Sequence, residues 1–240
     1  MKKAITTLVL TLLTASPIFA HYLWIETAGT AQLGKPHEIK VFFGEYTYGV
    51  LEQVEGENFP KVANFELWLI APDGTKLPMK TAPKDDHYSS LFTPTLEGTY
   101  TVVLTNNEID VIDYTQYDFG IFKTHYHATS KIQVGTSSAS TVSPNVGGLA
   151  INQLESSNGE IRMQVFYKKK PLPKNEFKIY MSDVWSKTLE TDENGMVSFT
   201  LPWKTKYTME TTYKEEVPGK YKGEAYEFIW HCATYCIINN

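Results

Sequence analysis

The residues of this 240-residue chain most able to do chemistry are its six histidines. A neutral imidazole is a good ligand for nickel, copper and zinc, and its ordinary pKa near 6.5 leaves it largely neutral at pH 7. A metal site would require the fold to bring several of these side chains together. The six are His21, His37, His87, His125, His127 and His231.

His21 is of interest because of what precedes it. Residues 1–20 have the pattern of a secretory signal peptide, with Lys2 and Lys3 before an apolar stretch and small residues up to Ala20. Cleavage after Ala20, which we predict, makes His21 the first residue of the exported chain. Its α-amino group and its imidazole would then be two adjacent nitrogen ligands for a transition metal.

The segment His125-Tyr126-His127 predicts a second pair of ligands. On a strand, residues two apart point to the same side, so two imidazoles spaced in this way can share one ion. The alternative is that the pair lies on a solvated face.

The sequence around the remaining histidines gives less indication of a metal ligand. His231 shares its face of a predicted strand with Ile229 and Ala233, and such apolar neighbours favour a buried core histidine over a ligand. His87 lies in a polar turn and is expected to be exposed, while His37 begins a strand.

Other potentially reactive groups have structural explanations. Cys232 and Cys236 lie four residues apart on one predicted strand, about 13 Å at ~3.3 Å per residue, which predicts two separate buried thiols and not a disulfide. We assign the carboxylates of Glu215, Glu224 and Glu227 to solvated turns. Nucleophile-elbow, phosphate-loop and His-Glu-x-x-His motifs are missing from the sequence, so we expect no enzyme of those classes.

The chain is rich in aromatic and β-branched residues, and turn residues recur between short alternating stretches, which predicts an all-β protein. We expect two β-sandwich domains in tandem and no helix of normal length, with residues 113–120 as a loop. A Ser/Thr-rich stretch marks the boundary between the domains. The predicted division is a signal peptide at 1–20, an immunoglobulin-like sandwich at 21–135, a linker at 136–147 and a second sandwich at 148–240. The strands are expected at 22–25, 37–43, 65–70, 99–104, 126–134, 161–167, 177–181, 207–212 and 228–238.

The charge excludes a nucleic-acid-binding role. The full chain has a net charge of −5 and a single arginine, Arg162, and no basic stripe is present.

The start of the exported chain, Ala20 to Glu26, resembles the Ala-His-x-x-Trp-hydrophobic-acidic motif of NikM-like bacterial periplasmic proteins associated with nickel and cobalt uptake. Short motifs follow in the order found in that family, at 71–74, 97–100, 191–195, 218–226 and 231–234. The resemblance implies a periplasmic location in a Gram-negative cell and a transthyretin-like second domain. It also implies nickel or cobalt as the ion and an energy-coupling-factor type of membrane transporter as the partner. His21 and His231 match the family pattern.

The expected function is therefore non-catalytic capture of a nickel or cobalt ion for uptake, at a site between the two domains. Copper and zinc suit the same nitrogen donors. The candidate ligands are His21, His125, His127 and His231. Two alternatives remain open: a structural or adhesion module without metal, and an oxidative enzyme that holds copper in a histidine brace.

Overall fold

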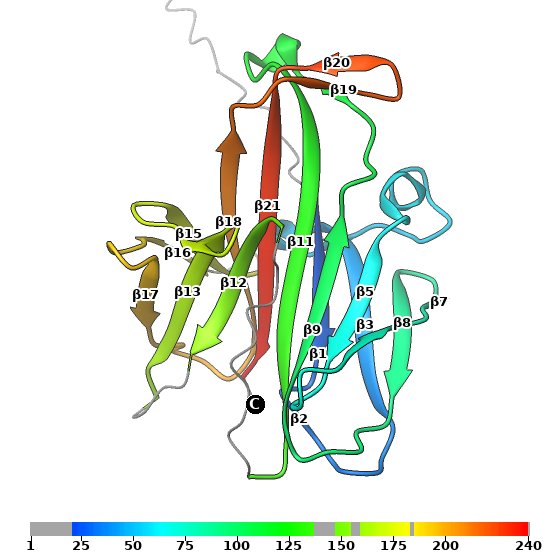
Figure 1. Ribbon diagram of the computed structural model, residues 1–240, viewed down its shortest axis with the longest axis vertical. Helices are drawn as coiled ribbons and strands as arrows, with labels where there is room; N and C mark the ends of the chain where they lie inside the picture. Colours follow the sequence, from blue (N-terminus) through cyan, green and yellow to red (C-terminus); the bar gives the residue numbers. More distant parts are fainter. Residues whose placement is uncertain (1–20, 137–146, 155–158, 183–184, 240) are drawn as a thin grey trace, which may run out of the picture.

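The computed structural model describes residues 21–136, 147–154, 159–182 and 185–239, and strands dominate them (Figure 1). The expected all-β sandwich fold is confirmed. The helical elements within these residues are three short 3-10 turns, η1 (Tyr46–Tyr48), η2 (Phe59–Val62) and η3 (Thr115–Tyr117). In this part of the chain no helix is long and apolar enough to cross a membrane.

A ten-stranded sheet forms the centre of the molecule. Its eight main strands are, in spatial order, β16 (Trp185–Glu190), β15 (Glu176–Met181), β18 (Lys206–Glu215), β21 (Phe228–Ile238), β11 (Ile121–Val134), β9 (Gly98–Asn106), β5 (Glu66–Ile70) and β6 (Lys76–Pro78). Two short strands also pair with β11, namely β2 (Thr30–Ala31) and β10 (Ile112–Asp113).

Three smaller sheets complete the fold. A five-stranded sheet contains β1 (Tyr22–Thr27), β3 (His37–Glu45), β8 (His87–Phe92), β7 (Ala82–Pro83) and β4 (Val50–Leu51). A four-stranded sheet contains β12 (Leu149–Leu154), β13 (Ile161–Tyr167), β14 (Lys170–Pro171) and β17 (Met196–Phe199). A two-stranded ribbon is formed by β19 (Gly219–Tyr221) and β20 (Glu224–Tyr226).

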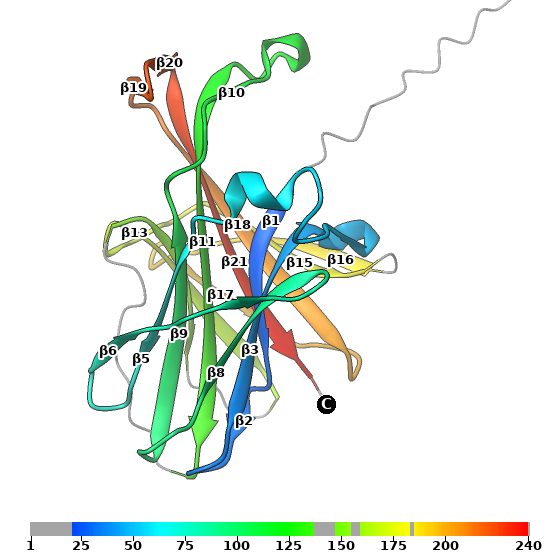
Figure 2. The same cartoon turned by 90° about the vertical axis from the view of Figure 1, so that its right-hand side faces the viewer.

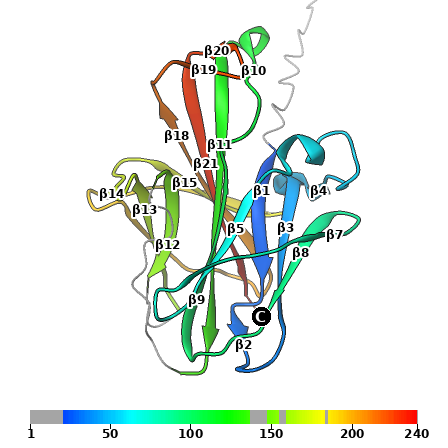
Figure 3. The ribbon, with the colours of Figure 1, turned by 45° about the vertical axis from the view of Figure 1, so that its right-hand side comes forward.

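The long strands β11 and β21 pair in parallel, and this pairing joins the two halves of the chain in one sheet. They lie between the five-stranded sheet and the four-stranded sheet, one on each side (Figure 3). The predicted signal peptide at 1–20 and most of the predicted linker at 136–147 lie outside the described residues. The predicted division into 21–135 and 148–240 remains a prediction, but the strands on its two sides share this sheet.

Side-chain alternation on β21 divides its residues between two cores. Cys232 and Cys236 pack into the core beneath the five-stranded sheet, whereas Ala233 and Tyr235 pack into the core beneath the four-stranded sheet. The Thr234 hydroxyl, on the cysteine side, donates to the Leu23 carbonyl of β1. Both cysteines are free and buried, as the sequence predicts.

The strand β11 alternates in the same way. Tyr126 and Ala128 belong to the core beneath the five-stranded sheet. From the other face, the Thr129 hydroxyl donates to the Ile151 carbonyl of β12 at 2.6 Å, and the Lys131 ammonium donates to the Gln153 carbonyl at 2.6 Å. Odd-numbered residues of β11 and β21 therefore face the four-stranded sheet, and even-numbered residues face the five-stranded sheet.

Two strands depart from their expected bounds by three residues or more, and one expected loop contains regular structure. The strand expected at 126–134 begins earlier, at Ile121, and the one expected at 207–212 continues to Glu215. The segment 113–120, expected to be a loop, contains the end of β10 and the short turn η3. Both extensions arise because the strand gains β21 as a hydrogen-bonded neighbour. The strand β21 pairs with β11 on one side and with β18 on the other.

Candidate metal centre

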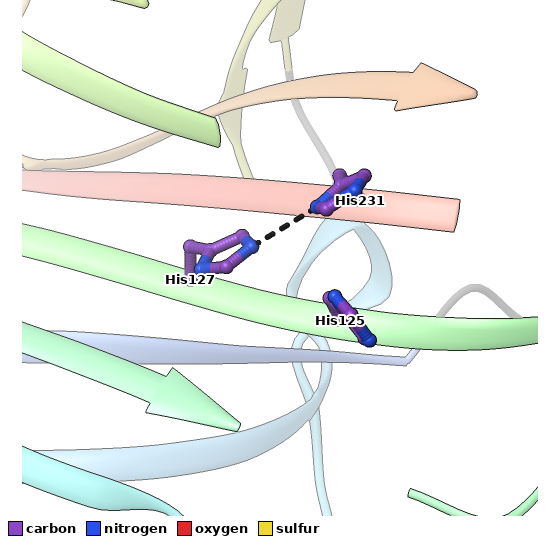
Figure 4. Close-up of side chains that lie close together, drawn as sticks. All are labelled: His125, His127 and His231. Atoms are coloured by element: carbon purple, nitrogen blue, oxygen red, sulfur yellow. Dashed lines mark hydrogen bonds between the residues drawn. The ribbon is translucent and has the colours of Figure 1, made fainter. Parts of the chain in front are cut away.

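Three of the candidate ligands meet at one point. His125, His127 and His231 each present a ring nitrogen, and these nitrogens all lie within 4.8 Å of one another (Figure 4). The rings of His127 and His231 are nearly parallel, with an interplanar angle of 12°, while the His125 ring is almost perpendicular to that of His231. We call these three residues the histidine cluster.

Strand register explains the meeting. His125 on β11 is the parallel register partner of His231 on β21. Register partners on neighbouring strands point to the same face at a spacing of about 4.8 Å. His127, two residues along β11, points to that face as well. The cluster therefore needs only two strands, although its members are 106 positions apart in the sequence at the extremes.

The spacing of the nitrogens suits a transition metal. His127 Nε2 lies 3.2 Å from His231 Nδ1. Two nitrogens in a tetrahedral site with bonds of 2.0–2.1 Å are about 3.3 Å apart, so this pair already has the required separation. The His125 nitrogen lies within 4.8 Å of both, and a shift of about 2 Å would bring it to the same distance from each.

The four-stranded sheet and its flanking residues cover the cluster. His127 is 3% exposed and His231 is 2% exposed, while His125 is half-buried. The Tyr167 ring lies edge-on to His231 at 5.2 Å. Gly148 packs directly against the His127 ring, and a Cβ on Gly148 would lie 2.6 Å from Nε2, so only glycine fits there without displacing the imidazole.

Burial keeps the cluster neutral. Loss of hydration lowers the pKa of each of the three imidazoles because it disfavours the charged form, and it lowers that of His125 to about 3. The charge of His231 would further lower the pKa values of both His125 and His127. Neutral imidazoles have the lone pairs that a metal ion requires.

Glu215 fixes the orientation of His231. Its Oε2 lies 3.0 Å from His231 Nε2, and its other oxygen accepts from the Lys168 ammonium. Burial raises the pKa of Glu215, but the hydrogen bonds with Lys168 and His231 favour the charged form and place the pKa at about 2. An ionised carboxylate only accepts, so we assign the proton of neutral His231 to Nε2, which leaves the Nδ1 lone pair directed into the cluster.

Sequence reasoning missed Glu215. It was placed in a solvated turn, but it ends β18 and is half-buried, whereas Glu216, Glu224 and Glu227 are exposed as expected. The missing information was the pairing of β18 with β21, which brings the end of β18 beside His231. The predicted strand ends at residue 212, so it gives Glu215 no partner.

His21 lies on the other face of the central sheet. The Tyr126 hydroxyl donates to the His21 carbonyl at 2.6 Å, and Tyr126 faces away from the cluster. The His21 imidazole contacts Glu52, with Nε2 2.8 Å from Oε1, and packs against the Phe43 ring. Three of the four candidate ligands therefore come together, and the structure does not bring His21 to them.

The other two histidines are also remote from the cluster. His37 Nε2 lies 2.7 Å from the Thr27 hydroxyl, and His87 Nδ1 lies 2.7 Å from the Asp86 carboxylate. His87 is half-buried and not fully exposed as expected, because its ring packs against Phe42 of β3.

Glu215→Gln is expected to weaken binding of a divalent transition metal by about 10- to 100-fold, because a neutral amide no longer fixes the His231 tautomer. The matched control is Glu216→Gln, which removes the neighbouring exposed carboxylate and should leave affinity unchanged. Isothermal titration of the metal-free protein measures both. Equal affinities for the two variants would contradict the assigned role of Glu215.

The lowered histidine pKa values also predict a pH dependence of stability. The unfolded chain binds protons on these histidines below pH 6.5 and the folded chain does not, so the metal-free protein should lose stability as the pH falls from about 6.5. Urea unfolding at pH 7.5 and pH 5 measures this loss. His127→Leu replaces the imidazole with an apolar side chain of similar size that binds no proton, so the loss of stability between pH 7.5 and pH 5 should be smaller. An unchanged loss would contradict the buried neutral state of His127.

Comparison with known families places the chain in a wider group. A family model described as a domain of unknown function, DUF4198, matches residues 18–215, well over half of the chain. The match includes both β11 histidines and ends at Glu215, before His231. A comparison with curated proteins finds no match. The chain belongs to the DUF4198 family.

Proposed function

We propose that this protein is an exported periplasmic binding protein that captures nickel or cobalt as cargo and supports its uptake. The observation that carries the proposal is the histidine cluster, in which two buried imidazoles and one half-buried imidazole present their nitrogens within 4.8 Å of one another. The NikM-like motif at the start of the predicted exported chain supports the choice of ion, and membership in the DUF4198 family is compatible with it.

The donor set suits capture of a divalent transition metal. Imidazole nitrogens bind nickel, cobalt, copper and zinc, and intrinsic affinity is highest for copper. Three protein ligands leave at least one coordination position for water or for a ligand supplied by a receiving protein. Such an open position would allow the ion to be passed on without first dissociating into solution.

The cluster would be partly prepared before the ion arrives. His127 and His231 already have the separation that a tetrahedral site needs, and Glu215 holds His231 in place. His125 is the half-buried member and the one that must move. We therefore assign it the role of completing the site after the ion contacts the other two.

His21 has a separate role in this proposal. Cleavage after Ala20 would give His21 a free α-amino group next to its imidazole, which contacts Glu52 on the face of the sheet opposite the cluster. These groups would offer a second, independent set of ligands. The receiving partner is a membrane transporter of the energy-coupling-factor type, as the NikM-like resemblance implies.

Titration of metal-free protein with Ni²⁺, Co²⁺, Cu²⁺ and Zn²⁺ tests the proposal. We expect a tight site with one ion per chain, and His127→Ala should weaken it by at least about 100-fold because a direct ligand is lost. His87→Ala, which removes a histidine outside the cluster, is the matched control and should have no effect.

His21→Ala separates the two sets of ligands. If the cluster is the main site, this variant retains the tight site. Tight binding that survives His127→Ala but disappears in His21→Ala would assign the ion to the other face, and absence of tight binding to the intact protein would contradict the metal-binding function.

A further inference from the structure

A cavity of about 650 Å³ lies on the face of β11 and β21 opposite the histidine cluster. Its floor includes Thr124 and Tyr126 of β11 and Trp230 and Cys232 of β21, which are the even-numbered residues of these strands. It therefore shares two strands with the cluster but none of the three histidines. Its volume is within the range of about 300–1,000 Å³ that is common for small-molecule sites.

The cavity is built from three parts of the chain. The central sheet provides the floor, β1 and β3 provide one side with Tyr22 and Phe43, and an arch at residues 109–119 provides the other. The arch runs from β9 to β11 through β10 and extends beyond the body of the molecule beside β19 and β20 (Figure 2).

Polar contacts hold the arch over the sheet. The Lys123 side chain is 5% exposed, and its ammonium donates to the carbonyls of Asn107 and Ile109 at the base of the arch. Lys222, from the turn between β19 and β20, pairs with Asp110 at 2.8 Å. The Phe119 ring rests edge-on against Trp230 at 5.1 Å. The arch that forms one side of the cavity is thus anchored at several points.

The lining favours a planar aromatic ligand. Aromatic rings supply much of the wall, from Tyr22, Phe43, Tyr114, Phe119, Tyr126 and Trp230. Such rings pair favourably with another ring by offset stacking or edge-to-face contact.

The charged groups of the lining are matched within the protein. Asp110 pairs with Lys222, and Lys61 bonds to Asn58 and pairs with Glu57. A charged ligand would have to compete with these partners, whereas a neutral ligand would not. The side chains of Tyr114 and Thr124 line the same cavity, and their hydroxyl groups can exchange a hydrogen bond with a hydroxyl or carbonyl group of the ligand.

We propose that this cavity binds a neutral, planar aromatic small molecule that carries a hydroxyl or carbonyl group. The site is separate from the histidine cluster, since its residues and the cluster occupy opposite faces of the sheet. Occupancy would cover His21, so that a ligand in the cavity and an ion on the His21 side would compete.

Calorimetric titration with 2-naphthol, a neutral two-ring phenol at pH 7, tests the proposal on the full exported chain. We expect saturable binding of one molecule per chain and a change in tryptophan emission that is lost in Trp230→Phe. Val111→Trp places a large side chain in the cavity from the arch and should weaken binding at least tenfold. Val111→Phe provides a smaller filling change if the larger one prevents folding.

Leu91→Trp is the matched control, because it adds the same side chain at an exposed position of β8 that does not line the cavity. Binding unchanged in this variant and weakened in the Val111 variants supports the site. No saturable binding of 2-naphthol, or equal binding by both tryptophan variants, would overturn it. Binding of the anion 2-naphthoate at least tenfold tighter than 2-naphthol would overturn the choice of a neutral ligand.

Nickel titration of Val111→Trp should give the same affinity as the unmodified protein. This result separates failure of the cavity proposal from failure of the metal-binding proposal.

Discussion

The structure depends on the parallel pairing of β11 with β21. This pairing joins strands from the two halves of the chain, and its register sets His125 beside His231. A shift by one residue would send each side chain of one strand to the opposite face and would disperse the histidine cluster. Packing on both faces fixes the register. Alternate residues of β21 enter the two cores, while β11 packs into the core beneath the five-stranded sheet and hydrogen-bonds to β12 from its other face.

The same alternation separates two kinds of chemistry. Odd-numbered residues of the two strands form a small polar site of neutral imidazoles, closed by Gly148 and oriented by Glu215. Even-numbered residues form the floor of an aromatic cavity that His21 also lines. The protein thus presents nitrogen ligands on one face of the central sheet and an apolar cavity on the opposite face. Movement of β11 or β21 would therefore change the geometry of both the histidine cluster and the cavity floor.

Local patterns in the sequence were sufficient for the all-β class, for most strands and for the two separate thiols. They also predicted the shared face of His125 and His127, which follows from a spacing of two residues. For His231 the apolar neighbours favoured a core position, and the NikM-like resemblance placed it among the candidate ligands. His21 was placed in the same set of ligands because its amine and imidazole could also bind metal. Pairing between distant strands decides both points, and a single sequence does not contain the register of such pairs. Glu215 was missed for the same reason.

X-ray absorption spectroscopy of the nickel-loaded protein, together with a crystal structure that locates the ion by anomalous scattering, tests the central claim most directly. The account predicts one ion coordinated by imidazole nitrogens of His125, His127 and His231, with Glu215 still bonded to His231. An ion bound instead at His21 and Glu52, or an ion without imidazole ligands, would contradict it.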